Sequence, residues 1–232
     1  MPDRTLSDEA LGAALFAGLG EGVRAQVLEA AAIKSYDRDQ RLFTQGDPAD
    51  SFFLVDSGSI KLVQSTPDGK EMIVRFIRPG EVIAAVALLP GGRYPVTALA
   101  AGPSRLAVWS SGRIRELVQR HPTLQANIMS AMAMHMQDAL SQGRELATSR
   151  VPQRLAAMLL RLADRGSTTV SDGVLVDQAL SREEMAEMVG TTRPRISLFM
   201  QRFHHLGLIE TNQDRFFIIK EKKLTDYLAQ IA

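Results

Sequence analysis

Hydrophobic and polar residues follow one another in different patterns along the chain. Over residues 6–33 the apolar side chains recur at steps of three and four, broken by Gly18 and Gly20, which predicts short helices. From Asp37 to Trp109 they come in short runs divided by Gly, Pro and Asp, as is typical of a β-sandwich or barrel. We therefore expect an antiparallel β-roll. Its predicted strands cover residues 41–43, 52–55, 60–63, 72–76, 82–87, 96–100 and 106–109.

Helical spacing returns after residue 111, and Pro122 suits the first turn of a long helix that should run to about Arg150. Two apolar stripes lie beside each other on this helix, so one can cover the roll while the other pairs with a second copy of the chain. A helix buried within one domain is the alternative. The second stripe contains Met129, Ala133, Met136, Leu140 and Ala147. The first stripe supplies the residues that we predict for the dimer interface: Ile128, Met132, His135, Ala139 and Leu146.

The last third of the chain carries the clearest functional signal. After a predicted helix from Pro152 to Ala163, Ser181 with a glutamate three residues later predicts a second helix that starts at Arg182 and runs to about residue 189. Thr192 can cap a third helix, whose apolar stripe is Ile196, Phe199, Met200 and Phe203. Two strands near residues 208–209 and 216–219, around a turn at 212–214, precede a final helix. This order of elements predicts a winged helix-turn-helix.

The chain is nearly neutral as a whole, but one segment of it is basic. The 27 basic and 26 acidic side chains leave a formal charge of +1, so nucleic-acid binding would need a cluster. Residues 188–209 contain no carboxylate but hold three arginines and two histidines. Because a recognition helix enters the major groove by its N-terminal end, we expect Arg193, Arg195 and Ser197 to reach base edges or flanking phosphates. A solvated basic face is the alternative.

Several classes of protein are excluded by what the sequence lacks. There is no cysteine, which rules out disulfides, thiolate zinc sites and cysteine-bound iron-sulfur clusters and fits a reducing cytoplasm. The acidic start and the absence of any apolar run of about 18 residues predict neither export nor a membrane span. The predicted roll has no histidine for a catalytic metal, and no phosphate loop or nucleophile elbow occurs. We expect a cytoplasmic protein that is not an enzyme and holds no metal.

Four motifs together resemble the Crp/Fnr superfamily of bacterial transcription regulators. They are Gln45-Gly46-Asp47-Pro48 with Gly58 twelve residues after Gly46, Pro79-Gly80-Glu81, Tyr94-Pro95-Val96-Thr97-Ala98, and the segment 180–209. The resemblance implies an α+β fold with a cyclic-nucleotide-binding-like jelly roll as a sensor domain over 1–120, a dimerisation helix over 121–150 and a winged helix-turn-helix domain over 151–232. It implies a homodimer on a near-palindromic DNA operator, with RNA polymerase as a further partner if the protein is an activator.

The resemblance also assigns roles to residues of the helix-turn-helix. Arg182 and Thr192 match phosphate-contacting positions, and Arg193 matches the arginine that reads a guanine. Pro194 and Leu198 stand where many members have a base-reading glutamate and a second base-reading arginine, so the operator should differ from the best-known family sequences. The predicted DNA-binding residues are Arg182, Thr192, Arg193, Arg195, Ser197 and Arg202.

The sensor domain departs from the cyclic AMP pattern of the family. The family's glutamate, arginine, serine and adenine-binding hydroxyl residues are replaced here by Ala85, Pro95, Val96, and Ala139 with Leu140. Because a buried phosphate without a cation or enough donors is strongly disfavoured, we expect no response to cyclic AMP.

The sequence leaves several alternatives to cyclic AMP as the effector of the sensor domain. Residues 94–95 resemble those of oxygen- and nitric-oxide-sensing members, some of which bind an iron-sulfur cluster and some haem. Lack of cysteine closes the first route. For haem, His135 is the axial-ligand candidate, with His121 as a second, although a packing role is commoner for such residues. We predict no cofactor; the alternatives are a haem- or other small-molecule-gated sensor and a ligand-independent regulator controlled by its abundance.

Overall fold

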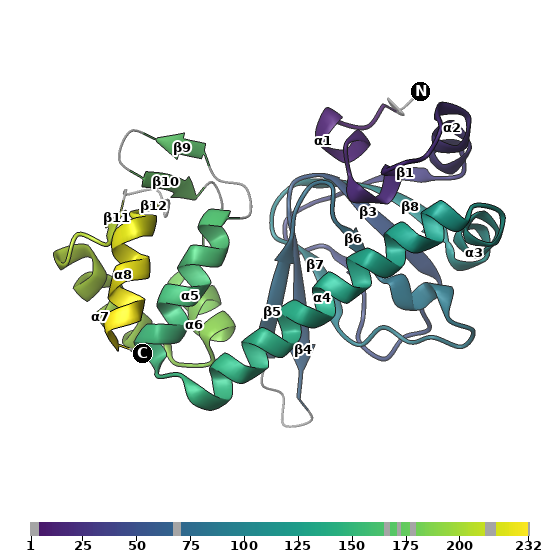
Figure 1. Cartoon of the computed structure of the whole chain (residues 1–232). Coiled ribbons are helices and arrows are strands. Elements are labelled where there is room, and N and C mark those ends of the chain that lie inside the picture. The colour runs from purple at the N-terminus through teal and green to yellow at the C-terminus, as the bar shows by residue number, and fades with distance from the viewer. Residues whose placement is uncertain are drawn as a thin grey trace. The chain divides into compact units, whose positions relative to one another are not determined.

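The computed structural model describes residues 5–66, 71–164, 168–170, 173–176, 180–211 and 217–231. The chain divides into two compact units, Met1–Asp138 and Ala139–Ala232 (Figure 1). The division falls within helix α4 (Pro122–Thr148), so this helix contributes to both units. None of the helices in the described residues is long and apolar enough to cross a membrane.

The first unit is built on two antiparallel sheets. One sheet has the strand order β1 (Ala32–Tyr36), β8 (Ser104–Ser110), β3 (Ser51–Ser57) and β6 (Val82–Ile83). The other has the order β2 (Arg41–Phe43), β7 (Thr97–Ala100), β4 (Ile60–Ser65) and β5 (Glu71–Ile77). Every pairing within both sheets is antiparallel. The predicted β-roll is confirmed; the predicted turn at 67–69 lies outside the described residues.

Two elements of the roll differ from the prediction. The start of strand β1 falls within the region 6–33 that was predicted to be helical, because Ile33 continues the three- and four-residue spacing of the apolar side chains. Pairing with β8 makes this segment a strand. The strand expected over residues 82–87 ends at Ile83. Ala84 has a left-handed backbone (φ 65°), and the 3₁₀ helix η2 (Ala85–Leu88) follows. A short apolar run fits a strand or a buried helical turn equally well, so the pattern could not separate them.

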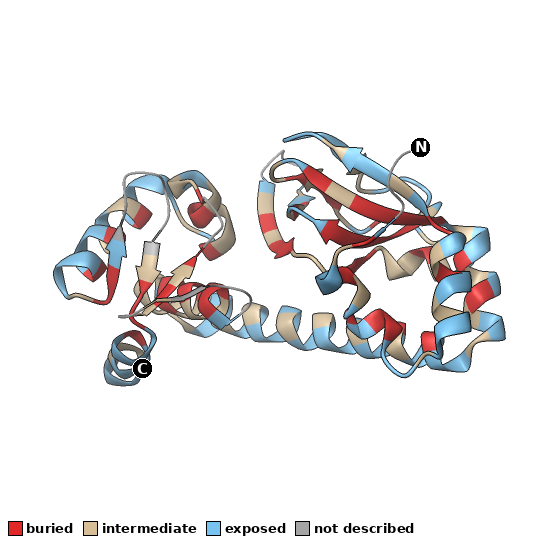
Figure 2. Cartoon of the chain, turned by 90° about the horizontal axis from the view of Figure 1, so that it is seen from above, coloured by how far each residue is buried: buried red, intermediate tan, exposed pale blue. Residues whose placement is uncertain are grey.

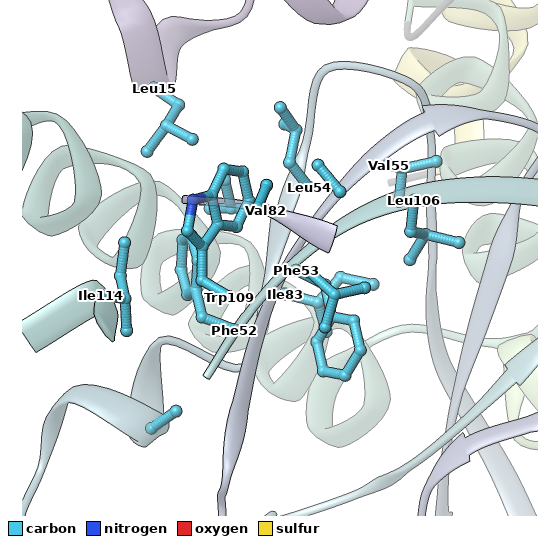
Figure 3. Close-up of a cluster of buried hydrophobic side chains, with 14 of the residues drawn as sticks. Leu15, Phe52, Phe53, Leu54, Val55, Val82, Ile83, Leu106, Trp109 and Ile114 are labelled. Carbon is cyan, nitrogen blue, oxygen red and sulfur yellow. The ribbon is translucent and has the colours of Figure 1, made fainter. Parts of the chain in front are cut away.

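Helices on either side of the roll share its core. These are α1 (Asp8–Leu11), η1 (Ala14–Phe16) and α2 (Glu21–Glu29) before it and α3 (Ser111–Arg120) after it. Trp109 of β8 is fully buried, its ring centroid is 5.8 Å from that of Phe52, and its indole Nε1 donates a 2.7 Å hydrogen bond to the Val27 carbonyl. Leu15 and Ile114 belong to the same cluster (Figure 3). The indole thus satisfies its only donor while filling the core.

Tyr94 is buried in the first unit, where it makes a ring contact and several hydrogen bonds. Its ring stacks on Phe43 with centroids 3.9 Å apart. Its hydroxyl accepts a 3.0 Å hydrogen bond from the Ser51 backbone N–H and lies 3.1 Å from Asp50 Oδ1 and from the Ser51 carbonyl. Burial raises the pKa of the Tyr94 phenol from 10.0 to about 12. The folded protein therefore holds this proton at a pH where the unfolded chain has released it.

We expect the stabilisation by the Tyr94 hydroxyl to be complete below pH 10 and to be lost as the pH rises from there to about 12. At neutral pH, Tyr94→Phe should lower the free energy of unfolding by about 1 kcal/mol through the lost hydrogen bonds. Urea unfolding of both proteins across this range is the measurement. The difference between them should shrink with rising pH, and a difference that stays constant contradicts the prediction.

Helix α4 is buried only near its start. Leu124 and Ile128 pack in the core of the first unit, and the Asn127 side-chain amide donates to the carbonyls of Leu15 (3.0 Å) and Ala17 (2.8 Å). Beyond Ile128 no residue of this fully described helix is buried, and its ribbon is tan and pale blue in Figure 2. Ile128 is 1% exposed. The prediction that Ile128 lies in the dimer interface is therefore wrong, because a residue in this core presents no surface to a second copy.

The second unit is a helix-turn-helix with a small antiparallel sheet. Its helices are α5 (Val151–Asp164), α6 (Arg182–Val189), α7 (Arg193–His205) and α8 (Glu221–Ile231). The sheet has the order β11 (Ile209–Thr211), β12 (Phe217–Ile219), β10 (Gly173–Val176) and β9 (Thr168–Val170). The winged helix-turn-helix is confirmed. Strands β9 and β10 were not predicted, because the sequence around them shows no clear strand alternation and only the pairing of β10 with β12 and β9 makes them strands. The predicted turn at 212–214 lies outside the described residues.

Candidate nucleic-acid interface

Helix α6 and the turn after it are fixed by local hydrogen bonds. The Ser181 hydroxyl accepts from the Glu184 N–H (3.1 Å) while the Glu184 carboxylate accepts from the Ser181 N–H (2.9 Å), the predicted capping box. Gly190 ends the helix with a left-handed backbone (φ 68°), which strongly favours glycine. Arg154 of α5 donates to the carbonyls of Val189 (2.8 Å) and Gly190 (3.2 Å). These bonds hold the turn that sets the start of α7.

One face of α7 is packed into the core of the second unit. Ile196, Met200 and Phe203 are buried, and the Phe203 ring meets Tyr227 of α8 edge to face at 5.3 Å. Phe199, the fourth member of the predicted stripe, is half-buried. Thr192 occupies the N-cap position, but its side chain makes no capping hydrogen bond. Its hydroxyl therefore caps nothing here, although the position itself was predicted correctly.

The opposite face of α7 is exposed and basic. Arg195 and Arg202 lie on this face, whereas Arg193 is two residues before Arg195, about 200° away around the helix, at its N-terminal end. All three are exposed, and none of them pairs with a carboxylate within the described part of the chain. The helix N-terminus adds partial positive charge near Arg193 and Arg195, whereas Arg202 lies in the last turn. Because no acidic side chain lies on α7, this face can take phosphates and the acceptor edges of bases without competition from within the helix. Gln201, which was not predicted, is also exposed; its spacing of three residues from Leu198 was the available signal.

The remaining predicted DNA-binding residues differ in exposure. Thr192 is exposed and Ser197 is half-exposed. Arg182 opens helix α6, which packs against α7; it is half-buried, with Nη1 3.5 Å from the Met185 sulfur. Burial lowers the pKa of the Arg182 guanidinium. All six predicted residues thus belong to one helix-turn-helix, with Arg182 on α6 and the rest from Thr192 to Arg202.

The residues predicted for the dimer interface differ in their exposure to solvent. Met132, Ala139 and Leu146 are exposed, His135 is half-buried and Ile128 is buried. The second apolar stripe of the same helix is the more exposed one, since Met129, Met136 and Leu140 lie open to solvent.

His135, the candidate axial ligand for haem, is not a freely exposed side chain. It is half-buried and already interacts with other groups of the chain. The described residues contain no cluster of three or more histidines and carboxylates that could hold a metal ion.

The positions that correspond to a cyclic AMP site carry no charged group. Ala85 is half-buried in η2, Pro95 is exposed and Val96 is half-buried. The buried cation of the roll, Arg75 of β5, is held by the carboxylate of Glu81 and lies 3.6 Å from that of Asp138. A cyclic phosphate would have to compete with these carboxylates for the Arg75 charge.

Fold and site together define a two-domain regulator, in which a nucleotide-binding-type roll is joined to a DNA-binding winged helix. Two known domain families match the chain in the same order. Residues 33–121 match the cyclic nucleotide-binding domain, and residues 153–227 match the Crp-like helix-turn-helix domain. The chain belongs to the Crp/Fnr superfamily of transcription regulators, which are DNA-binding proteins and not enzymes.

Known relatives resemble the chain over nearly its whole length. A CRP-like cAMP-activated global transcriptional regulator of Mycobacterium tuberculosis is 23% identical over 212 residues, which cover 90% of this chain and 95% of that protein. A global nitrogen regulator of Synechocystis is 26% identical over 225 residues, covering 96% and 94%. The solved structure of a CooA mutant from Carboxydothermus hydrogenoformans superposes with a TM-score of 0.77 at 22% identity and covers 97% of this chain and 98% of the other.

Proposed function

We propose that this regulator binds a near-palindromic operator as a homodimer, reads it with α7, and does so without cyclic AMP. The observation that carries the proposal is the set of three exposed arginines on α7, a helix without a carboxylate, in a chain whose formal charge is only +1. In this proposal Arg193 reads a guanine, and Arg195 and Ser197 reach neighbouring base edges or phosphates. Arg182, Thr192 and Arg202 contact phosphates and set the register of the helix on the duplex.

The dimer is supported by the exposed apolar surface of α4. Six large apolar side chains on this helix are exposed: Met129, Met132, Met134, Met136, Leu140 and Leu146. All but Met134 fall on one side of a helix of 3.6 residues per turn, together with Ala139. Contiguous apolar patches of this kind are uncommon on monomers and are typical of helix pairing. A twofold pair would present two copies of α7 to half-sites about 34 Å apart.

Independence from cyclic AMP is supported by the uncharged residues at positions 85, 95 and 96 and by the pairing of Arg75. We expect calorimetric titration with cyclic AMP to show no saturable binding in the micromolar range, because the roll offers no unpaired cation to the phosphate at these positions. Saturable micromolar binding at the roll would show that this part of the proposal is wrong.

The experiment that tests the proposed function is a mobility shift on the chain's own operator. Genome-wide mapping of bound sites supplies the operator, and purified protein is then titrated onto that duplex with nothing added. Binding at nanomolar concentration, lost when one half-site is scrambled, is the expected result. Binding that needs a small-molecule extract favours a gated sensor, and binding that ignores the sequence contradicts operator recognition.

A further inference from the structure

One large apolar side chain lies in the middle of the basic face of α7. Leu198 is 61% exposed, whereas Ile196 and Met200, two residues before and after it, are 0% and 1% exposed. Residues two apart are separated by about 200° around a helix of 3.6 residues per turn, so they lie on opposite sides. Leu198 therefore faces directly away from the core that holds the helix in place.

The neighbours of Leu198 on the helix surface are polar or cationic, apart from one proline. One turn before and one turn after it stand Pro194, Arg195, Gln201 and Arg202, and all four are exposed. The leucine thus projects between two guanidinium groups and an amide. A single exposed leucine is ordinary on a protein surface; this one occupies the second turn of the helix on the face that would meet DNA.

The major groove offers few partners to an apolar side chain. Its base edges present hydrogen-bond donors and acceptors, and the exception is the 5-methyl group of thymine. A leucine pressed against a donor or acceptor would remove water from that group and return no hydrogen bond, which is unfavourable. Packing on a methyl group removes apolar surface from water on both sides.

We infer that Leu198 is a specificity-determining residue that packs on the 5-methyl group of a thymine in each half-site. The inference rests on the proposed reading of the operator by α7 and adds one base preference to it. The base pair under Leu198 is a T·A pair, with its thymine on the strand that faces α7. Cytosine at the same place would present its N4 amino donor to a side chain that cannot accept a hydrogen bond.

The test removes the methyl group from the DNA and the leucine from the protein. The full chain first selects its site from a random-sequence duplex library. Each symmetric pair of thymines in that site is then replaced by deoxyuridine, which differs only by the methyl group, and the dissociation constant is measured for wild type, Leu198→Ala and Leu206→Ala. Leu206 is the control because it is 51% exposed but caps the other end of α7.

One thymine pair should respond. Loss of a methyl contact corresponds to about fourfold per half-site, from roughly 0.8 kcal/mol for one buried carbon, and thus to about tenfold or more when both half-sites change. Wild type and Leu206→Ala should show this loss, and Leu198→Ala should bind the thymine and uracil duplexes equally. Alanine is a strong helix former, so the exposed replacement keeps α7 intact.

Two outcomes overturn the inference and can be told apart. If Arg193→Ala weakens binding while no uracil substitution separates wild type from Leu198→Ala, operator reading by α7 stands and the leucine contact is wrong. If the library yields no preferred sequence, operator recognition itself fails and the inference falls with it.

Discussion

Met136→Asp should convert the protein from dimers to monomers and reduce its affinity for the operator by at least about 100-fold. Met136 is 63% exposed on α4, at the centre of the proposed dimer face. In a twofold pair the substitution places two carboxylates close to each other and removes both from water, which costs several kcal/mol. Light scattering of the free protein and a mobility shift on the operator measure the two effects.

Met134→Asp is the matched control for this prediction. Met134 is 64% exposed, lies on the same helix and changes to the same residue, so the cost to helix formation is the same. It is only two positions from Met136 and therefore about 200° away around the helix, outside the proposed face. This variant should remain dimeric and bind the operator normally. A dimeric Met136→Asp protein, or equal losses in both variants, would place the dimer contact elsewhere.

Sequence was most informative where structure is decided locally. The bounds of α6 follow from the Ser181 capping box at one end and Gly190 at the other, and both are formed as predicted. The buried stripe of α7 follows from the helical period, since Ile196, Met200 and Phe203 are all buried. In each case the information lies within a few residues of the feature that it determines.

The sequence left alternatives open for elements whose packing depends on residues far away along the chain. The two apolar stripes of α4 were recognised, but the pattern does not say which one packs on the roll. That choice depends on contacts with residues over 100 positions away, such as the bonds from Asn127 to the Leu15 and Ala17 carbonyls. They turn Ile128 inward and leave Met129 and Met136 exposed. Strand β1 was missed for the same reason, because only its partner β8 makes it a strand.

The second large effect is expected at the start of α7. Arg193→Ala should weaken operator binding by about 5- to 150-fold, the equivalent of roughly 1–3 kcal/mol, and should relax the preference at one base pair in each half-site. Arg193 is exposed at the N-terminal end of α7, which is the end of a recognition helix that reaches base edges. Binding to a panel of operators mutated at single base pairs measures both the loss and the relaxed position.

Arg182→Ala is the comparison that separates base reading from phosphate contact. Arg182 is half-buried at the start of α6, so its guanidinium is restricted in reach and suits a fixed phosphate better than a base edge. Its loss should weaken all duplexes alike and lower the salt dependence of binding by about one unit for each contact. Arg120→Ala, an exposed charge on α3, controls for net charge alone and should change little. Sequence-blind losses of equal size for Arg193→Ala and Arg182→Ala would contradict the division of roles, because a residue that reads a base must distinguish one duplex from another.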